Sequence, residues 1–451
     1  MRWLANLVYL IGAAFYLPVL CYQMLVQRKN RRGWRQRFGH WPIRPSDKRR
    51  IWIHAVSLGE INATPLLVRK LEQRLPDADI VISTTTDTGY ARACKLYGAD
   101  RVFRFPLDFS WVVARVLRRV QPSLIVLVEL EVWYNLVRTA SGRGIPIAVV
   151  NGRLTDRSRK RFGLIAPLAR AMFRRLTWVG AQDERIATRF RELGTLTDRV
   201  EVIGSVKWDT TTVADTIDGA NDLAATLGIE PDVPLWVCGS TGPAEEAIIL
   251  DAYARLLEAG VSLTLAVIPR KPERFDEVAD LIRSRGHTCI RRSERPDAPP
   301  TNAPVPPGHP ETVPPSVDPG HAPARTAPRP VFLGDTMGEL RKFYSLASVV
   351  FVGRSLVPMG GSDPMEVAAL ARPIIVGPHM DNFAAPVEAF AAVDAIRVAD
   401  NVRTLATAVG DLIADQKAAR QQGIRARKVV LDNQGATDRT ADRLVGLLTR
   451  K

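Results

Sequence analysis

Short apolar runs alternate with stretches that carry hydrophobic residues at helical spacing through most of this 451-residue chain. Such alternation is typical of a parallel β-sheet that helices cover on both faces. The pattern therefore predicts an α/β chain with two doubly wound domains. The predicted strands lie within residues 49–56 and at 80–83, 102–105, 124–128, 147–150, 178–180, 200–203, 235–241, 263–268, 331–333, 349–352 and 374–376.

Two breaks in this pattern predict the domain organisation. Residues 210–230 lose the strand signal and read as a connection between domains. Thirteen of the 32 prolines lie between residues 296 and 330, a stretch with almost no large apolar residue that cannot bury a core. The predicted parts are a first domain over 51–215, a linker over 216–230, a second domain over 231–430 with a disordered insert at 291–330, and a C-terminal helix over 431–451.

The N-terminus has a different pattern, because residues 3–26 contain no charge. A helix of this length can cross a hydrocarbon core of about 30 Å. Ten Lys or Arg residues and one acid follow within residues 28–50, so the positive-inside rule places the rest of the chain in the cytoplasm. We predict a transmembrane or membrane-anchoring helix over residues 1–27 and a basic juxtamembrane segment over 28–50. Scattered aromatic residues leave open a helix that lies in the membrane interface.

The net charge of +15 allows a nucleic acid, an anionic membrane or an anionic substrate as partner. Its concentration next to the apolar segment favours the membrane surface. The four cysteines are widely spaced, and the sequence has neither a CxxC pair nor an HExxH motif. We therefore predict neither a disulfide framework nor a metal bound by the protein.

Charged side chains follow several strands of the first domain. Glu60 opens a helix, where a carboxylate either complements the helix dipole, the commoner case, or serves as a general base. Glu129 and Glu131 end a buried strand and would share one side as long as strand geometry continues; two idle acids there are costly. Lys207 is either a solvated charge or a partner for an anionic group. His54 lies within a strand, and we expect it to be a core or supporting residue.

Polar turns follow other strands. Residues 84–89, TTTDTG, either cap a helix or hydrogen-bond a sugar or phosphate. Residues 334–340 and 360–364 are glycine-containing turns that each open a helix, the second with Asp363 or Ser362 as its N-cap. Such a turn often only shapes a corner. Two turns from one domain, however, can converge on the phosphate of a nucleotide.

Several of these segments together resemble the 3-deoxy-manno-octulosonic acid (Kdo) transferases of lipopolysaccharide assembly. The resemblance covers nearly the whole chain apart from the insert. It is carried by HAVSLGE at residues 54–60, GSVKWD at 204–209, PRKPERF at 269–275, GDTMGEL at 334–340, FVGRSLVPMGGSDPMEVAAL at 351–370 and PIIVGPHMDNF at 373–383.

The resemblance implies a GT-B fold, with two Rossmann-like domains that face a cleft, and assigns roles to residues. Glu60 would be the general base, Glu131 would support the transition state, and Lys207 would support the transition state and the leaving group. By analogy, the terminal helix would cross back to the first domain. The expected CMP-binding residues are Pro269, Arg270, Met337, Gly338, Glu339, Asp363, Pro364, Met365 and Glu366, with Gly360, Gly361, Ser240 and Thr241 as further candidates.

The implied reaction is an inverting transfer of Kdo from CMP-Kdo to a hydroxyl of a lipid A precursor, lipid IVA. It would need no cofactor and no metal, because cationic side chains and helix starts can neutralise one leaving phosphate. The enzyme would act at the cytoplasmic face of the inner membrane, with CMP-Kdo, the lipid A precursor and the anionic membrane surface as partners. We expect no nucleic-acid partner.

The chain departs from the family pattern in three segments. Arg354 stands where the family has Gly, Ser362–Asp363 replaces His-Asn, and Lys271 replaces His. A carboxylate at residue 363 would weaken donor binding unless it caps the helix and Arg354 compensates its charge. Two alternative functions remain: another GT-B enzyme that uses a UDP-sugar on a lipid-linked acceptor, and a membrane-anchored nucleic-acid-binding protein, although the sequence has no recognised nucleic-acid motif.

Overall fold

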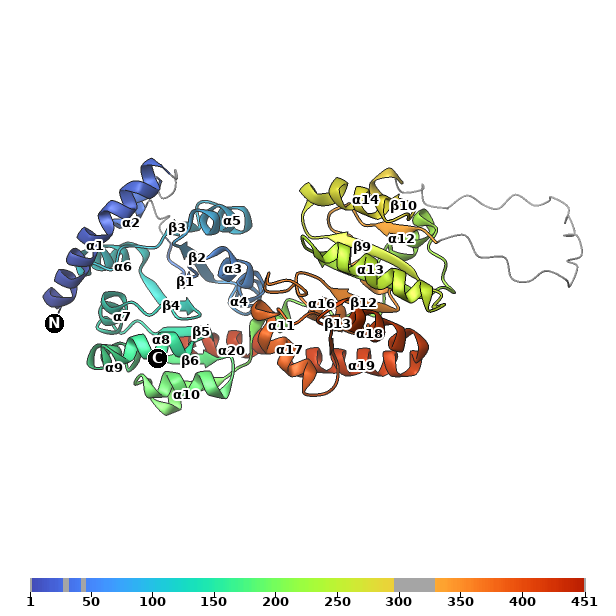
Figure 1. The fold of residues 1–451 in the computed structure, drawn as a ribbon. Coiled ribbons are helices and arrows are strands. Elements are labelled where there is room, and N and C mark those ends of the chain that lie inside the picture. The colour runs from blue at the N-terminus through green and yellow to red at the C-terminus, as the bar shows by residue number, and fades with distance from the viewer. Residues whose placement is uncertain (1, 27–31, 42–45, 296–328, 450–451) are drawn as a thin grey trace, which may run out of the picture. The chain divides into compact units, whose positions relative to one another are not determined.

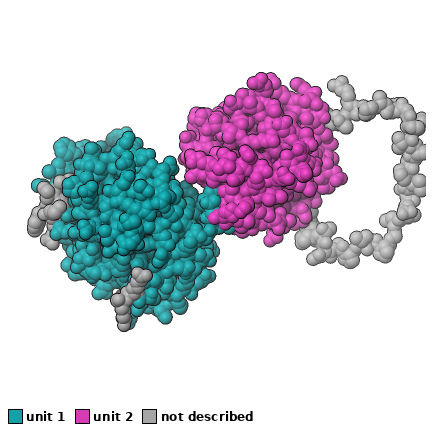
Figure 2. Space-filling model, turned by 90° about the horizontal axis from the view of Figure 1, so that it is seen from below, with its two compact units in different colours: residues 1–210, 433–451 teal, residues 211–432 magenta. Residues whose placement is uncertain are grey.

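The computed structural model describes residues 2–26, 32–41, 46–295 and 329–449. It divides the chain into two compact units, which Figure 2 shows in different colours. Unit 1 comprises residues 1–210 and 433–451, and unit 2 comprises residues 211–432. Each unit has a seven-stranded sheet whose paired strands are all parallel, with helices on both faces (Figure 1). The predicted α/β class is confirmed.

The sheet of unit 1 has the strand order β3-β2-β1-β4-β5-β6-β7. The order reverses between β1 and β4, and such a switch point is where open α/β sheets bind ligands. Its strands are β1 (Arg49–His54), β2 (Ala78–Thr84), β3 (Val102–Arg104), β4 (Pro122–Val128), β5 (Ile147–Gly152), β6 (Trp178–Ala181) and β7 (Val200–Val202). Its helices are α1 (Arg2–Leu25), α2 (Trp34–Arg37), α3 (Leu58–Ala63), α4 (Pro65–Arg74), α5 (Asp87–Tyr97), α6 (Ser110–Val120), α7 (Tyr134–Ser141), α8 (Asp156–Gly163), α9 (Ala166–Phe173), α10 (Glu184–Glu192), α11 (Val206–Asp209) and α20 (Ala436–Thr449).

The sheet of unit 2 has the order β10-β11-β9-β8-β12-β13-β14 and reverses between β8 and β12. Its strands are β8 (Leu235–Thr241), β9 (Thr264–Pro269), β10 (Cys289–Arg291), β11 (Val331–Leu333), β12 (Val349–Val352), β13 (Ile374–Val376) and β14 (Arg397–Val398). Its helices are α12 (Ala220–Leu227), α13 (Glu245–Glu258), α14 (Phe275–Ser284), α15 (Leu340–Leu346), α16 (Met365–Ala368), α17 (Ala384–Ala391), α18 (Val402–Ala414) and α19 (Gln416–Asn433).

Both faces of each sheet are buried, which explains why the strands read as continuous apolar runs. In β1, Ile51 and Ile53 belong to the core on one face, and Trp52 belongs to the core on the other. All three side chains are fully buried. The alternation of side chains along a strand therefore supplies two separate cores from one sequence run.

Several predicted boundaries are wrong. From the sequence we expect one helix from Glu60 through Leu71, but the structure has two, α3 and α4, because Pro65 opens a new one. We also expect a helix to start at Met337, whereas α15 begins at Leu340. The predicted insert begins too early, since β10 runs to Arg291 and Arg292 is buried in an ion pair with Glu339. Residues 296–328 of the insert lie outside the described residues.

Helix α1 forms as predicted but packs on unit 1 through a polar side chain. Asn6 is buried and bonds to Ser110 of α6 and Asn135 of α7. Across the described ranges we find no helix with the length and apolar character needed to cross a membrane. The transmembrane interpretation is therefore not supported. Asn6 and Pro18 interrupt the apolar run of α1.

The C-terminal helix α20 belongs to unit 1, although α19 before it belongs mostly to unit 2. Asp209 at the end of α11 holds this helix, because its carboxylate accepts the backbone N–H groups of Gly435 at 2.6 Å and Thr437 at 2.5 Å. The aspartate of the GSVKWD segment therefore has a structural partner. It also fixes α11, on which Lys207 lies.

Candidate active site

The candidate site of unit 1 lies at the carboxyl edge of its sheet, beside the switch point between β1 and β4. The turn after β1 carries Glu60, whose backbone N–H is capped by Ser57. The Glu60 carboxylate accepts the N–H of Val56 at 2.8 Å and the hydroxyl of Ser57 at 2.9 Å. Glu60 is therefore held at this edge by its own turn. The same hydrogen bonds also fit the commoner role of such a residue, an acid that complements the dipole at the start of a helix.

Glu129 and Glu131 follow β4 and join Glu60. Burial, together with the charge of Glu60, raises the pKa of Glu129, while Arg153 and Lys207 oppose the rise. Burial, with smaller contributions from Glu60 and Glu129, raises the pKa of Glu131 to about 7. Because the charge of Glu60 acts on both acids, the three carboxyl groups lie close to one another, with Lys207 close to Glu129.

The backbone of Glu129 and Glu131 does not continue the geometry of a strand, on which their predicted common side depended. Strand β4 ends at Val128, and Glu129 has a left-handed backbone with φ of 62°. Such a conformation is uncommon for a residue with a side chain and often occurs at functional sites. The turn at Glu129, rather than the pleat of the strand, sets the directions of these two side chains.

His54 and Asn151 support this cluster from neighbouring strands. His54 ends β1, and its Nδ1 lies 3.1 Å from the Ser83 carbonyl oxygen and its Nε2 4.0 Å from Oε2 of Glu131. Burial lowers the pKa of His54 to about 3, so the ring is neutral. Asn151 at the end of β5 accepts the N–H of Val206, which places α11 and its Lys207 at the same edge. The sequence signal for Asn151 was weak, since it lies inside a strand run.

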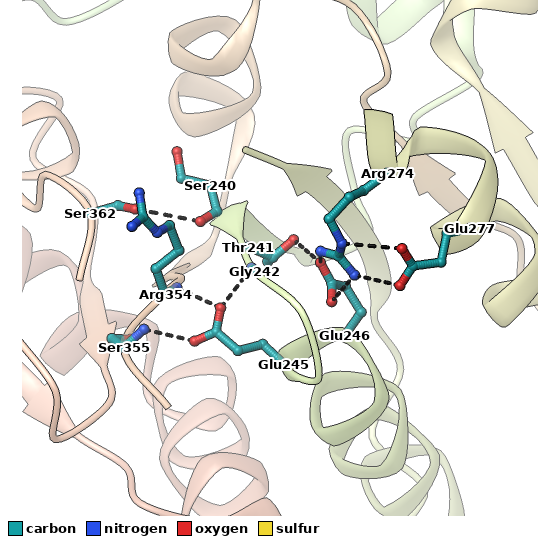
Figure 3. A network of polar contacts seen from close by, with 10 residues as sticks. All are labelled: Ser240, Thr241, Gly242, Glu245, Glu246, Arg274, Glu277, Arg354, Ser355 and Ser362. Carbon is teal, nitrogen blue, oxygen red and sulfur yellow. Dashed lines mark hydrogen bonds and ion pairs between the residues drawn. The ribbon is translucent and has the colours of Figure 1, made fainter. Parts of the chain in front are cut away.

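The candidate site of unit 2 has a frame of two buried carboxylates (Figure 3). Glu245 is fully buried and accepts backbone N–H groups from Gly242, Arg354, Ser355 and Leu356. Its neighbour Glu246 accepts the Thr241 hydroxyl at 2.8 Å and pairs with Arg274 at 2.6 Å. These acids at the start of α13 tie together the turns after β8, β9 and β12. We predicted a helix there but assigned neither residue a role.

Most predicted donor-binding residues lie on those turns. Arg270 follows β9, is exposed, and its N–H donates to the Thr241 carbonyl at 3.0 Å. Ser362 donates to the Ser240 carbonyl. Burial raises the pKa of Glu366, and the nearby Arg341 and Arg270 oppose this, so Glu366 lies close to Arg270. Ser240, Thr241, Arg270 and Glu366 therefore share one edge of the sheet.

The turn before α15 contains the remaining predicted residues. Met337 is 71% exposed, and Gly338 has a φ of 94° that favours glycine. Glu339 is bound by Arg292 and Lys342, so its carboxylate already has cationic partners in the protein.

The paired glycines have a structural reason. A Cβ atom on Gly361 would lie 2.3 Å from Sδ of Met380, and one on Gly360 would lie 2.3 Å from the Asn382 amide. Both residues also have left-handed φ values, 82° at Gly360 and 78° at Gly361. Contacts within the protein therefore explain both glycines, and no bound ligand is needed for the explanation.

Comparison with known proteins decides the family. A family model described as "3-Deoxy-D-manno-octulosonic-acid transferase (kdotransferase)" matches residues 32–210. A Haemophilus influenzae 3-deoxy-D-manno-octulosonic acid transferase is 32% identical over 403 residues, 89% of this chain and 87% of that protein. The chain belongs to the Kdo transferase family. A Bordetella pertussis relative of the same name is 32% identical over 87% of this chain and 86% of its own.

Solved structures agree on the fold. A Rickettsia africae glycosyltransferase covers 90% of this chain with a TM-score of 0.53 at 10% identity, and that whole chain is matched. MurG from Acinetobacter baumannii covers 88% of this chain, with 99% of its own matched, at a TM-score of 0.52 and 14% identity. This Kdo transferase family member therefore has the GT-B fold.

The residues that depart from the Kdo transferase pattern each have a partner within the protein. Arg354 has a left-handed backbone with φ of 59°, where glycine is favoured, and its guanidinium donates to the Met359 carbonyl. Asp363 accepts the N–H of Met365, the first residue of the short helix α16, at 2.8 Å, but the N-cap is Pro364, so the predicted N-cap at Asp363 or Ser362 is wrong. Lys271 pairs with Glu273 at an exposed position. The Asp363 carboxylate therefore has a backbone partner at the start of α16 without being its N-cap, and the compensation of its charge by Arg354 stays a prediction.

Proposed function

We propose that this member of the Kdo transferase family transfers Kdo from CMP-Kdo to a hydroxyl of a lipid A precursor, with inversion at the anomeric carbon. The observation that carries the proposal is the cluster of Glu60, Glu129 and Glu131 at the switch point of unit 1. The family relatives support Kdo as the transferred sugar. The acceptor, the stereochemistry and the residue roles are part of the proposal.

In the proposed reaction, Glu60 takes the proton of the acceptor hydroxyl as its oxygen attacks the anomeric carbon of Kdo. The bond between that carbon and the phosphate oxygen of CMP breaks, and CMP leaves with the electron pair. Glu60 is suited to this task because two hydrogen bonds fix its carboxylate and it is partly exposed. Lys207 offers a positive charge to an anionic group of the substrates.

Unit 2 supplies the donor-binding half in this proposal. Arg270 balances the charge of the CMP phosphate, and Glu366 beside it accepts hydrogen bonds from the ribose or the base. The remaining predicted residues on these turns, including Pro269, Pro364 and Met365, shape the same edge. Cationic side chains neutralise the leaving phosphate, so we propose a reaction that needs no divalent metal or other cofactor.

We further propose that the enzyme works at the cytoplasmic face of the inner membrane, with α1 lying in the interface. The apolar side chains of α1 that are exposed support this placement. They are Leu7, Leu10, Ile11, Phe15, Tyr16, Leu17, Val19, Tyr22 and Leu25. A helix with such a surface binds a membrane by burying its apolar face among the headgroups.

Purified protein with CMP-Kdo and a tetraacylated lipid A precursor tests the function. We expect a product with one or more added Kdo residues, an unchanged rate in the presence of EDTA, and a higher Tm with CMP than with UDP. Transfer from a UDP-sugar without transfer from CMP-Kdo would reject the proposed donor. Salt-dependent DNA or RNA binding without transfer would reject the enzyme.

A further inference from the structure

Two arginines are buried near the carboxyl ends of β2 and β3, outside the cluster of acids. Arg37 at the end of α2 is 9% exposed, and Arg104 at the end of β3 is 5% exposed. Arg37 donates to the Thr85 carbonyl at 2.7 Å. Arg104 pairs with Asp87, whose side chain is 45% exposed.

The charges at this position do not balance. Taking a guanidinium out of water costs several kcal/mol unless an anion compensates it. Among the described residues, Arg37 has no ion pair, and the buried Nη1 of Arg104 has no hydrogen-bond partner. Burial and the charge of Arg104 lower the pKa of Arg37, and the charge of Asp87 only partly opposes this. Two buried cations therefore face one half-exposed carboxylate.

A cavity of about 580 Å³ adjoins Arg104. Its lining also includes Arg32, Gln36, Tyr90 and the Asp87 carboxylate that pairs with Arg104, whereas Arg37 lies behind the lining. The Arg104 guanidinium lies over the Tyr90 ring, 4.3 Å from its centroid. This contact fixes the orientation of the guanidinium plane. Guanidinium groups held in this way suit the oxygens of a phosphate.

One turn connects the arginines to Glu60. Arg37 binds the carbonyl of Thr85, and the hydroxyls of Thr84 and Thr86 on either side donate to the Val56 carbonyl. The N–H of Val56 donates to the Glu60 carboxylate. A substrate whose hydroxyl reaches Glu60 therefore lies next to the turn that Arg37 holds.

We propose that Arg104, with the buried charge of Arg37 behind it, forms a binding site for a phosphate monoester group carried by the acceptor. A dianionic group supplies the missing negative charge and an acceptor for Nη1 of Arg104. This inference rests on the proposed function for its assignment to the acceptor, but the phosphate site itself does not. The TTTDTG turn then links acceptor binding to the position of Glu60.

Equilibrium binding of inorganic phosphate to the full chain tests the site without any activity. We expect saturable binding to the wild type, at least a tenfold loss in Arg104→Met, and partial recovery in Arg104→Lys. Arg92→Met is the matched control, because Arg92 lies partly exposed on α5 and binds Asn62. Unfolding curves show whether each variant is folded. Absence of phosphate binding to the wild type, or equal affinity in folded Arg104→Met, overturns the site.

Kinetics with two acceptors test the assignment. For a phosphorylated acceptor, Arg104→Met raises KM at least tenfold and leaves KM for CMP-Kdo unchanged. For the same acceptor without its phosphate, wild type and variant have the same KM. If the variant instead loses binding to phosphatidylglycerol vesicles while its acceptor KM stays normal, the site belongs to the membrane and the acceptor assignment is wrong.

Discussion

Nε2 of His54 lies 4.0 Å from Oε2 of Glu131. The imidazole is fully buried and stacks on Phe105 with a centroid distance of 3.7 Å. Its Nδ1 lies 3.1 Å from the Ser83 carbonyl oxygen and 3.0 Å from the Ser83 hydroxyl. In the tautomer that donates from Nδ1 to the carbonyl, Nε2 presents a lone pair. Nε2 has no hydrogen-bond partner among the described residues, and a protonated Glu131 carboxyl matches it.

The first prediction concerns stability and pH. The raised pKa of Glu131, about 7, means that the folded protein holds this proton more tightly than the unfolded chain. The contribution of Glu131 to folding is therefore complete below pH 4.5 and is lost as the pH rises to about 7, by on the order of 3 kcal/mol. Denaturant unfolding of wild type and Glu131→Gln between pH 5 and 8 measures it. Parallel pH profiles would show that Glu131 is ionised throughout.

The second prediction concerns His54. His54→Gln can place an amide near the Nε2 position, whereas His54→Asn keeps a polar group at the Ser83 contact and leaves the Nε2 position empty. We expect His54→Asn to lose at least about tenfold in kcat and to shift the pH profile of kcat, with KM little changed. His54→Gln should retain more of the rate. Equal losses without a shifted profile would indicate a role in packing alone.

The strands and part of the candidate site could be predicted from the sequence, whereas contacts that depend on tertiary packing could not. The strands are predictable because both faces of each sheet are buried, so runs such as 124–128 are apolar throughout. Glu60, Glu131 and Lys207 are predicted site residues because they lie shortly after such runs and within motifs of the family, and their roles stay predictions. The proximity of Arg37 to Arg104 was not predictable, because α2 and β3 meet only through tertiary packing. The short strands β10 and β14 contain too few apolar residues to give a signal.

The third prediction concerns the attachment of α1 to unit 1. Asn6 makes three hydrogen bonds, to the hydroxyl and N–H of Ser110 and to the amide of Asn135. Asn6→Ala leaves buried polar groups unpaired and should lower the free energy of unfolding by about 1–3 kcal/mol. Leu10→Ala on the exposed face is the control and should change it little. Equal stability of both variants would mean that Asn6 does not hold the helix.

The fourth prediction concerns the frame of the donor site. Glu245→Ala removes the acceptor for four backbone N–H groups and should lower the free energy of unfolding by about 2–4 kcal/mol. Glu245→Gln keeps part of these bonds and should weaken CMP binding with a smaller loss of stability. Glu258→Gln, at the exposed end of the same helix, should affect neither. If folded Glu245→Gln bound CMP with normal affinity, the hydrogen bonds of Glu245 would not contribute to donor binding.

The central claim is that Glu60 accepts the proton of the attacking hydroxyl. Single-turnover transfer from CMP-Kdo by Glu60→Gln tests it most directly, because glutamine retains the size of the side chain and an acceptor for the Val56 N–H. We predict a rate at least about 100-fold below that of the wild type, with unchanged CMP affinity and Tm. A rate within about twofold of the wild type would show that Glu60 serves only its helix and that another group is the base.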